Sequence, residues 1–288
     1  MKEKPLIIFD TDMDTDCDDA GALLMLINAH LSGDIALMGV ICDSVCEYAA
    51  PYCRSVLDYY NLSIPVGEIY AHIEDEGRFS SYKAHQKHCE SQAYNRMLSE
   101  KAKPFASSSE VYKSLLKDAP PRSVTILCVG MLTSIFELMR DNVALFEEKV
   151  EKIVIMGNPY KKNDFNFSMD AVATKGFFEI CPCPVFVSYL GGEIITGNHL
   201  SETLEPSHPV RRAYEIWTLG KGRSSWDLIA ALYAMDPSSD LFKITDTCRI
   251  EYNEIEKTSS LAHGTRDNII TLNCSNEQMQ EILNGLLR

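Results

Sequence analysis

Aspartate occupies six of the ten positions from 10 to 19, and none of these ten residues is basic. Carboxylates at this density repel one another and lower stability unless a positive charge lies among them. A hard divalent cation, which prefers oxygen ligands, would supply that charge. Two carboxylates at the start of a helix would interact well with its dipole, but that role does not account for six. The segment therefore predicts a metal site, and it reads Asp10-Thr11-Asp12-Met13-Asp14-Thr15-Asp16-Cys17-Asp18-Asp19.

The acidic segment directly follows residues 6–9, a short apolar run typical of a buried strand. Ligands of open α/β sheets bind at the carboxyl ends of the strands, so the carboxylates stand where a ligand is expected. An EF-hand calcium loop fits the spacing of the first aspartates but fails further on. Thr15 stands where that loop needs glycine, and Gly21 stands where it needs glutamate. We therefore exclude an EF-hand.

A strand that ends in D-x-D also resembles the first motif of haloacid dehalogenase-type phosphatases. That resemblance implies Asp10 as a nucleophile and Asp12 as an acid and base beside Mg²⁺. The family also needs a later acidic pair, and the nearest candidate, Gly157-Asn158, lacks the aspartate. This phosphatase stays an alternative function.

Short Val- and Ile-rich runs alternate with longer amphipathic segments along the chain. The runs lack polar alternation, as strands covered on both faces should, and the longer segments have helical spacing. This alternation predicts an α/β fold, an open and mainly parallel sheet with helices on both faces. The predicted strands are 6–9, 35–42, 64–67, 123–129, 152–156 and 184–189, a pair of strands within 247–273 follows, and the predicted helices are 19–31, 49–60, 225–235 and 276–287.

No repeat or low-complexity linker divides the chain, so we expect residues 1–288 to form a single domain. The polar stretch near 70–110, which contains His72, His85 and His88, is interpreted as a helical insertion. Ser275 with Gln278 three residues later predicts a capping box at the start of the last helix.

The formal net charge is −14, from 27 basic and 41 acidic residues among 288. An acidic surface repels phosphate backbones and anionic lipids, so nucleic acid and membrane surfaces are excluded as partners. No apolar run reaches the roughly 20 residues that a membrane span needs, and the start does not resemble a signal peptide. The ten cysteines are interpreted as reduced thiols, and we expect a cytoplasmic protein.

Distinctive motifs stand at four separated places over most of the chain. They are Asp10 and Asp12 with Asp18-Asp19-Ala20, then Val129-Gly130-Met131-Leu132-Thr133, then Met156-Gly157 with Asp164-Phe165-Asn166 and Asp170, and finally Trp226-Asp227. In type and order these motifs resemble the inosine–uridine nucleoside hydrolase family. That family begins with a strand, D-x-D and then D-D-A at a helix start. A later strand ends in x-G-x-L-T, the next in M-G before an acidic-aromatic-Asn triplet, and an aspartate opens a late helix.

The resemblance implies hydrolysis of the N-glycosidic bond of a ribonucleoside or related ribosyl compound, by a homodimer or homotetramer that needs Ca²⁺. It implies Asp12, Asp19, Asp227 and the backbone carbonyl of Val129 as Ca²⁺ ligands, with Asp12 also the general base. By the same resemblance, the ribose hydroxyls are bound by Asp18 and Asn166 on the 2′ and 3′ side and by Asp164 on the 5′ side, and Asp10 has a supporting role.

The chain departs from the family pattern at several of these positions. Its acidic loop is two residues longer than usual, and Met13-Asp14 replaces a Pro-Gly pair. Trp226 stands where many members carry a histidine that protonates the leaving base, so it is interpreted either as a stacking surface for the base or as a core residue. Asp14 and Asp16 are either further ligands or solvated. These departures leave a second alternative open, a metal- and ribose-binding homologue without turnover.

Overall fold

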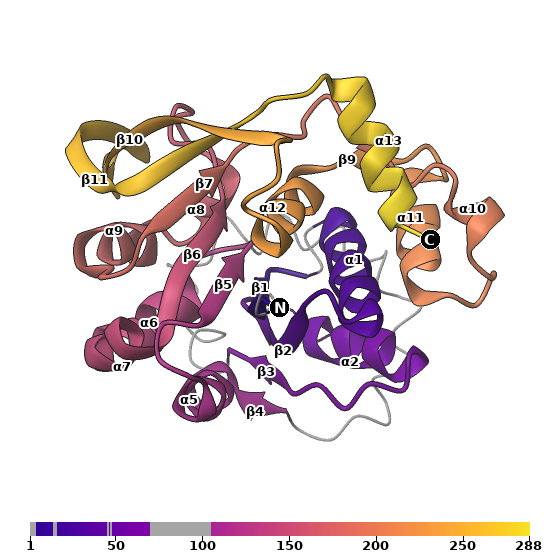
Figure 1. The fold of residues 1–288 in the computed structure, drawn as a ribbon, viewed down its shortest axis with the longest axis horizontal. Coiled ribbons are helices and arrows are strands. Elements are labelled where there is room, and N and C mark those ends of the chain that lie inside the picture. Colours follow the sequence, from indigo (N-terminus) through magenta and orange to yellow (C-terminus); the bar gives the residue numbers. More distant parts are fainter. Residues whose placement is uncertain (1–3, 14–15, 45, 47, 70–104) are drawn as a thin grey trace.

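The computed structural model describes residues 4–13, 16–44, 46, 48–69 and 105–288 (Figure 1). In this part of the chain a nine-stranded sheet has the order β10-β11-β7-β6-β5-β1-β2-β3-β4. Neighbouring strands are parallel except for β10 and β11, which form an antiparallel hairpin at one edge. The strands are β1 (Leu6–Thr11), β2 (Ala36–Cys42), β3 (Val66–Glu68), β4 (Ala106–Ser107), β5 (Val124–Cys128), β6 (Val150–Met156), β7 (Val185–Ser188), β10 (Phe242–Asn253) and β11 (Thr258–Leu272).

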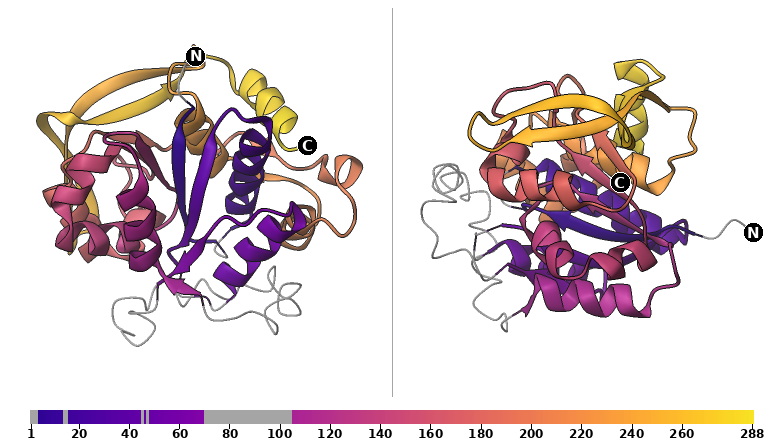
Figure 2. Two further views of the ribbon diagram at one scale, coloured as in Figure 1. Left: turned by 60° about the horizontal axis from the view of Figure 1, so that its bottom comes forward. Right: turned by 90° about the vertical axis from the view of Figure 1, so that its left-hand side faces the viewer.

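Helices cover both faces of the sheet, each over its own hydrophobic core (Figures 1 and 2). One face carries α1 (Asp18–Ser32), α2 (Ala49–Tyr59), α11 (Pro209–Thr218), α12 (Trp226–Met235) and α13 (Asn276–Leu286). The other carries α5 (Ser108–Asp118), α6 (Thr133–Asp141), α7 (Val143–Lys149), α8 (Phe165–Met169) and α9 (Ala171–Ile180). The remaining short elements are β8 (Ile195–Thr196), α10 (Leu200–Thr203) and β9 (Arg223–Ser224).

The fold confirms the sequence prediction of an open, mainly parallel α/β sheet. The six predicted single strands and the four predicted helices form within two residues of their expected bounds, and the capping box of Ser275 and Gln278 is present. The predicted pair of strands also forms, but its first strand begins at Phe242, five residues before the expected start at 247. The cysteines of the described residues are all free thiols. The interpretation of 70–110 as an insertion falls largely outside the described residues, as do its three histidines and Asp14. None of the helices described is long and apolar enough to cross a membrane.

Successive side chains of β1 point to opposite faces of the sheet, and this alternation decides which way the Asp10 carboxylate points. Ile7 and Phe9 pack in the core beneath α1 and α12, while Ile8 packs in the core beneath α5. Asp10 lies two residues after Ile8, so it shares that face, and the Tyr112 hydroxyl of α5 donates a hydrogen bond to its carboxylate. Burial raises the pKa of Asp10 to about 8. Asp10 is therefore a buried supporting residue beneath the loop that follows β1.

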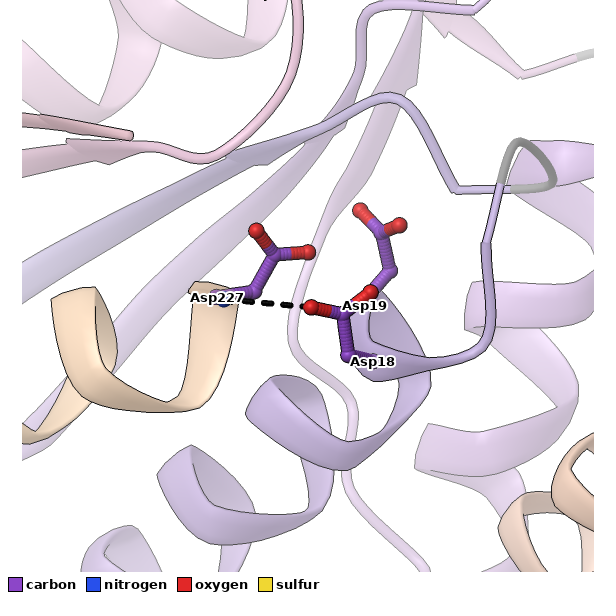
Figure 3. Close-up of side chains that lie close together, drawn as sticks. All are labelled: Asp18, Asp19 and Asp227. Carbon is purple, nitrogen blue, oxygen red and sulfur yellow. Dashed lines mark hydrogen bonds between the residues drawn. The ribbon is translucent and has the colours of Figure 1, made fainter. Parts of the chain in front are cut away.

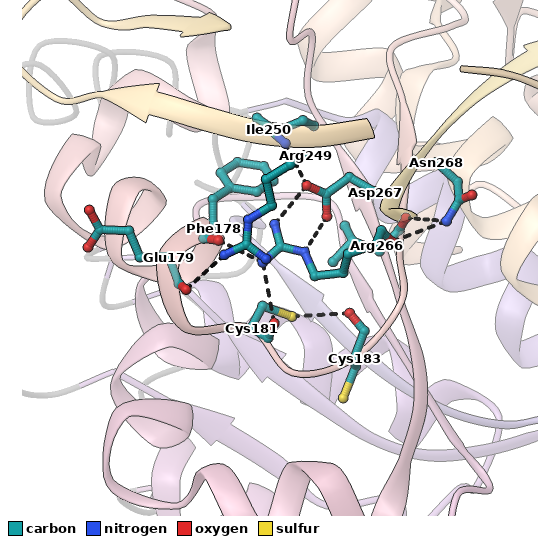
Figure 4. A network of polar contacts seen from close by, with 10 residues as sticks. Phe178, Glu179, Cys181, Cys183, Arg249, Ile250, Arg266, Asp267 and Asn268 are labelled. Atoms are coloured by element: carbon teal, nitrogen blue, oxygen red, sulfur yellow. Dashed lines mark hydrogen bonds and ion pairs between the residues drawn. The ribbon is translucent and has the colours of Figure 1, made fainter. Parts of the chain in front are cut away.

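The β10–β11 hairpin is fixed to the sheet by a polar network at the carboxyl end of α9 (Figure 4). Arg266 donates to the carbonyls of Phe178 at 2.6 Å and Cys181 at 3.3 Å, which satisfies acceptors that the helix end leaves free. Asp267 accepts from Arg266 and from the backbone N–H of Ile250 at 2.7 Å. The network places the hairpin and holds no part of the acidic cluster.

His208 joins α11 to the end of α2 in a geometry that requires a neutral ring. The backbone N–H of Val210 donates to Nδ1 at 3.2 Å, so the ring proton is on Nε2, which lies 2.8 Å from the Tyr60 hydroxyl. The side chain is buried, and this burial lowers the pKa of His208 to about 4. Protonation of Nδ1 would also break the cap of α11.

This histidine predicts a loss of stability in mild acid. Because its folded-state pKa lies below the unfolded value of about 6.5, the unfolded chain binds more protons between pH 6.5 and 4. Stability contributed by His208 is therefore present above pH 6.5 and falls as the pH drops towards 4. His208→Asn keeps a cap acceptor and does not titrate, so we expect it to lose about 1–3 kcal/mol less than the wild type between pH 7 and 4. Urea unfolding at both pH values measures the difference, and parallel pH curves would contradict the prediction.

Candidate active site

The sheet has a topological switch point at β1, whose neighbours are β2 on one side and β5 on the other. Beyond β1 the chain continues into α1 on one face of the sheet, and beyond β5 it continues into α6 on the other face. A switch point of this kind forms a cleft at the carboxyl edge of the sheet. A pocket of about 390 Å³ lies there, a volume that suits a small organic ligand. Every predicted site residue lines it: Asp12, Asp18, Asp19, Val129, Asp164, Asn166, Trp226 and Asp227.

Two helix N-termini bring three buried carboxylates together at the floor of the pocket (Figure 3). Asp18 and Asp19 open α1, and Asp227 stands in the first turn of α12. One oxygen from each side chain lies within 4.8 Å of the others. The backbone N–H of Asp227 donates to Asp18 Oδ2 at 3.3 Å, which ties the start of α12 to the start of α1.

The cluster carries more negative charge than its surroundings neutralise. Burial raises the pKa of Asp18, Asp19 and Asp227 well above the usual range, and the charges of neighbouring aspartates, including Asp12, raise it further. Asp227 Oδ1 is buried and has no hydrogen-bond partner. A set of oxygen donors with an unsatisfied oxygen fits a hard divalent cation and could bind one.

Residues from the neighbouring strand ends complete this floor. Gly130 packs directly on Asp12, and a Cβ at Gly130 would lie 2.4 Å from the Asp12 backbone nitrogen. The glycine of the x-G-x-L-T motif is thus required for close approach of the loops after β1 and β5. Asn166 Nδ2 donates to the Val129 carbonyl at 2.6 Å and to the Met156 carbonyl at 3.2 Å, while the Val129 oxygen retains a second lone pair.

Asp16 has a definite structural partner. Its carboxylate forms a bidentate ion pair with Arg223, and the interpretation of Asp16 as solvated is therefore wrong. The Arg223 guanidinium lies 5.0 Å from the ring centre of Trp226, within cation–π range. Trp226 is half-buried and lines the pocket, so it is more than a core residue.

Several pocket residues were missed by the sequence analysis. Trp217 stands in the last turn of α11, Arg223 begins β9 after a glycine-containing turn, and Lys161 stands in the loop after β6. Each is an isolated residue without a characteristic spacing, and no sequence signal distinguishes it from surface residues of its type.

Residues 7–278 match the family model described as inosine-uridine preferring nucleoside hydrolase. The chain belongs to this family. The resemblance inferred from the four motifs is thereby confirmed. The family consists of nucleoside hydrolases, which act on small ribosyl substrates, and typically depends on a metal ion. No curated protein matches the chain.

Solved structures share the fold along almost the whole chain. An inosine-uridine preferring nucleoside hydrolase from Bacillus anthracis is 14% identical with a TM-score of 0.74, and the alignment covers 98% of this chain and 99% of that one. A purine-preferring ribonucleoside hydrolase from Gardnerella vaginalis is 13% identical, with a TM-score of 0.70 and coverage of 98% and 99%. The type III effector protein XopQ, in complex with adenosine diphosphate ribose, is 14% identical, with a TM-score of 0.74 and coverage of 100% and 94%.

Proposed function

We propose that this chain hydrolyses the N-glycosidic bond of a ribonucleoside or a related ribosyl compound in a Ca²⁺-dependent reaction, with Asp12 as the general base. The observation that supports this most strongly is the convergence of Asp12, Asp18, Asp19 and Asp227 on one pocket, with the buried Asp227 Oδ1 unsatisfied. Asp10 does not line the described pocket, which argues against the phosphatase alternative in which Asp10 is the nucleophile.

Asp12, Asp19, Asp227 and the Val129 carbonyl would hold the Ca²⁺. Their donors are all oxygens, as Ca²⁺ requires, and they come from the ends of β1 and β5 and from two helix starts. Asp18 lies in the same cluster and could share in the coordination. When bound, Ca²⁺ would supply Lewis acidity that makes a nearby water a stronger nucleophile.

Cleavage of an N-ribosidic bond passes through a sugar with oxocarbenium character, so the ribose must be held rigidly. Asp18 and Asn166 would bind the 2′- and 3′-hydroxyls. Asn166 is already oriented by its Nδ2 hydrogen bonds to two carbonyls, which leaves its Oδ1 as an acceptor for a hydroxyl. Asp12, which lines the same pocket, would take the proton of the attacking water.

The leaving base would stack on Trp226. The indole is half-buried, lines the pocket and is held by Arg223, which Asp16 in turn fixes. Stacking of a base on an aromatic side chain contributes about 1–3 kcal/mol and grows with ring area, so we infer a preference for purines. We further propose a single-domain, cytoplasmic protein that forms a homodimer or homotetramer.

Release of free ribose from a panel of purine and pyrimidine nucleosides tests the function. With Ca²⁺ present we expect release, fastest from purine nucleosides, and we expect a chelator to abolish it because four acidic groups then lack their counter-charge. Restoring Ca²⁺ should restore the rate, whereas Mg²⁺ should not. Tight Ca²⁺ binding without release from any nucleoside would contradict hydrolysis of nucleosides. A ribosyl ligand that then stays bound and intact would favour the non-catalytic alternative.

A further inference from the structure

The pocket wall that follows β6 differs in charge from the acidic floor. Asp164, which the family resemblance assigns to the ribose 5′-hydroxyl, is the N-cap of α8 and is 9% exposed. The backbone N–H of Phe167 donates to its Oδ1 at 3.3 Å, and backbone N–H groups of Asn158 and Asn166 also hydrogen-bond to the carboxylate. The Asp164 carboxylate therefore uses most of its acceptor capacity in hydrogen bonds to the backbone of its own loop.

Lys161 stands three residues earlier in this loop and lines the same pocket from an exposed position at its rim. Its positive charge lies close enough to help lower the pKa of Asp164, which burial raises. No hydrogen bond or ion pair joins the Lys161 ammonium to any residue in the described part of the chain. Arg223, also a pocket residue, is neutralised by Asp16.

Asn158 lies beside Lys161 and offers a second donor. Its Oδ1 accepts the backbone N–H of Tyr160 at 2.9 Å, which orients the side chain and leaves the Nδ2 amide available to the pocket. An unpaired ammonium together with an oriented amide is a donor set for an anion, and a phosphate oxygen accepts from both.

We propose that the ribosyl substrate carries a phosphate on its 5′ oxygen and that Lys161 binds this phosphate at the rim of the pocket. The proposal rests on the proposed function, because it places the 2′- and 3′-hydroxyls at Asp18 and Asn166. The 5′ carbon then points to the wall formed by Asp164 and Lys161. The phosphate extends past Asp164 towards solvent, away from the carboxylates of the floor, where like charges would repel it. The substrate class is therefore a nucleoside 5′-phosphate.

Steady-state kinetics with inosine and with inosine 5′-monophosphate test the proposal on the full-length, Ca²⁺-loaded protein. We expect kcat/KM to be about 10-fold higher for the monophosphate, because a charge-assisted hydrogen bond to phosphate strengthens binding by about that factor. In Lys161→Met the ratio of the two kcat/KM values should fall by about 10-fold, chiefly through KM for the monophosphate. Lys162→Met, which changes an exposed lysine outside the pocket lining, should keep the wild-type ratio.

The two proposals fail in different ways. Hydrolysis of inosine with no preference for the monophosphate, or an unchanged ratio in Lys161→Met, would overturn the phosphate site and leave the hydrolase intact. Absence of hydrolysis of both compounds and of every nucleoside in the panel would contradict the proposed function. In that case calorimetry with ribose and ribose 5-phosphate still decides the phosphate site. Tighter binding of ribose 5-phosphate that is lost in Lys161→Met would support it, and equal or absent binding of the two sugars would overturn it.

Discussion

Replacement of Asp12 by asparagine is expected to lower kcat by about 10²–10⁴-fold, the range that a positioned general base contributes. The amide is nearly the same size as the carboxylate, so the close contact of Gly130 with the backbone of Asp12 should be preserved. The asparagine amide, however, cannot accept the proton of the attacking water. Ribose release measured at saturating Ca²⁺ and across pH 5–9 gives the result, and the acidic limb of the pH–rate profile should disappear.

Asp12 is also a proposed ligand, so the experiment must separate the two roles. If the loss arises only from weaker Ca²⁺ binding, a higher Ca²⁺ concentration restores the rate of Asp12→Asn. If Asp12 is the base, the rate stays low when the site is saturated. Activity within a few-fold of the wild type would show that another group takes the proton.

Replacement of Asp227 by asparagine is expected to have opposite effects on the metal-free and the Ca²⁺-bound protein. Burial raises the pKa of Asp227 above its unfolded value, and Asp18 and Asp19 raise it further, so at pH 7 its charge destabilises the metal-free fold. The neutral amide removes this repulsion, and metal-free Asp227→Asn should unfold at a higher temperature than the wild type. The gain should fade as the pH falls towards the unfolded pKa of about 4, and below that pH the carboxyl is protonated in both states.

The same change should weaken Ca²⁺ binding by about 100-fold or more, because one charged ligand is lost. Calorimetric titration measures the affinity, and thermal unfolding with Ca²⁺ or with a chelator measures the linkage between binding and stability. The control is Asp240→Asn, which removes the same charge from an exposed aspartate after α12, outside the pocket lining. It should change neither the Ca²⁺ affinity nor the unfolding temperature. Unchanged Ca²⁺ affinity in Asp227→Asn would remove this residue from the ligand set.

Local sequence patterns predicted the central strands and the position of the acidic loop. A parallel strand buried on both faces must be a short apolar run, and its carboxyl end is where the chain leaves the sheet, so β1 and the aspartates after it could be located directly. The alternation that turns Asp10 towards α5 also follows from strand geometry, although its Tyr112 partner does not.

Within the pocket, sequence alone determined which residues of the four motifs gather at one edge of the sheet, because each motif follows a strand or opens a helix. Only the tertiary structure decided how their charges are balanced. Asp227 lies 209 residues from Asp18 and meets it through the packing of α12 against α1, and Arg223 lies 207 residues from Asp16. Lys161 likewise lines the pocket because of the path of the loop after β6, which belongs to the tertiary structure. Such contacts depend on how helices pack, which local periodicity does not encode, and they determine which charges in the pocket remain available to a ligand.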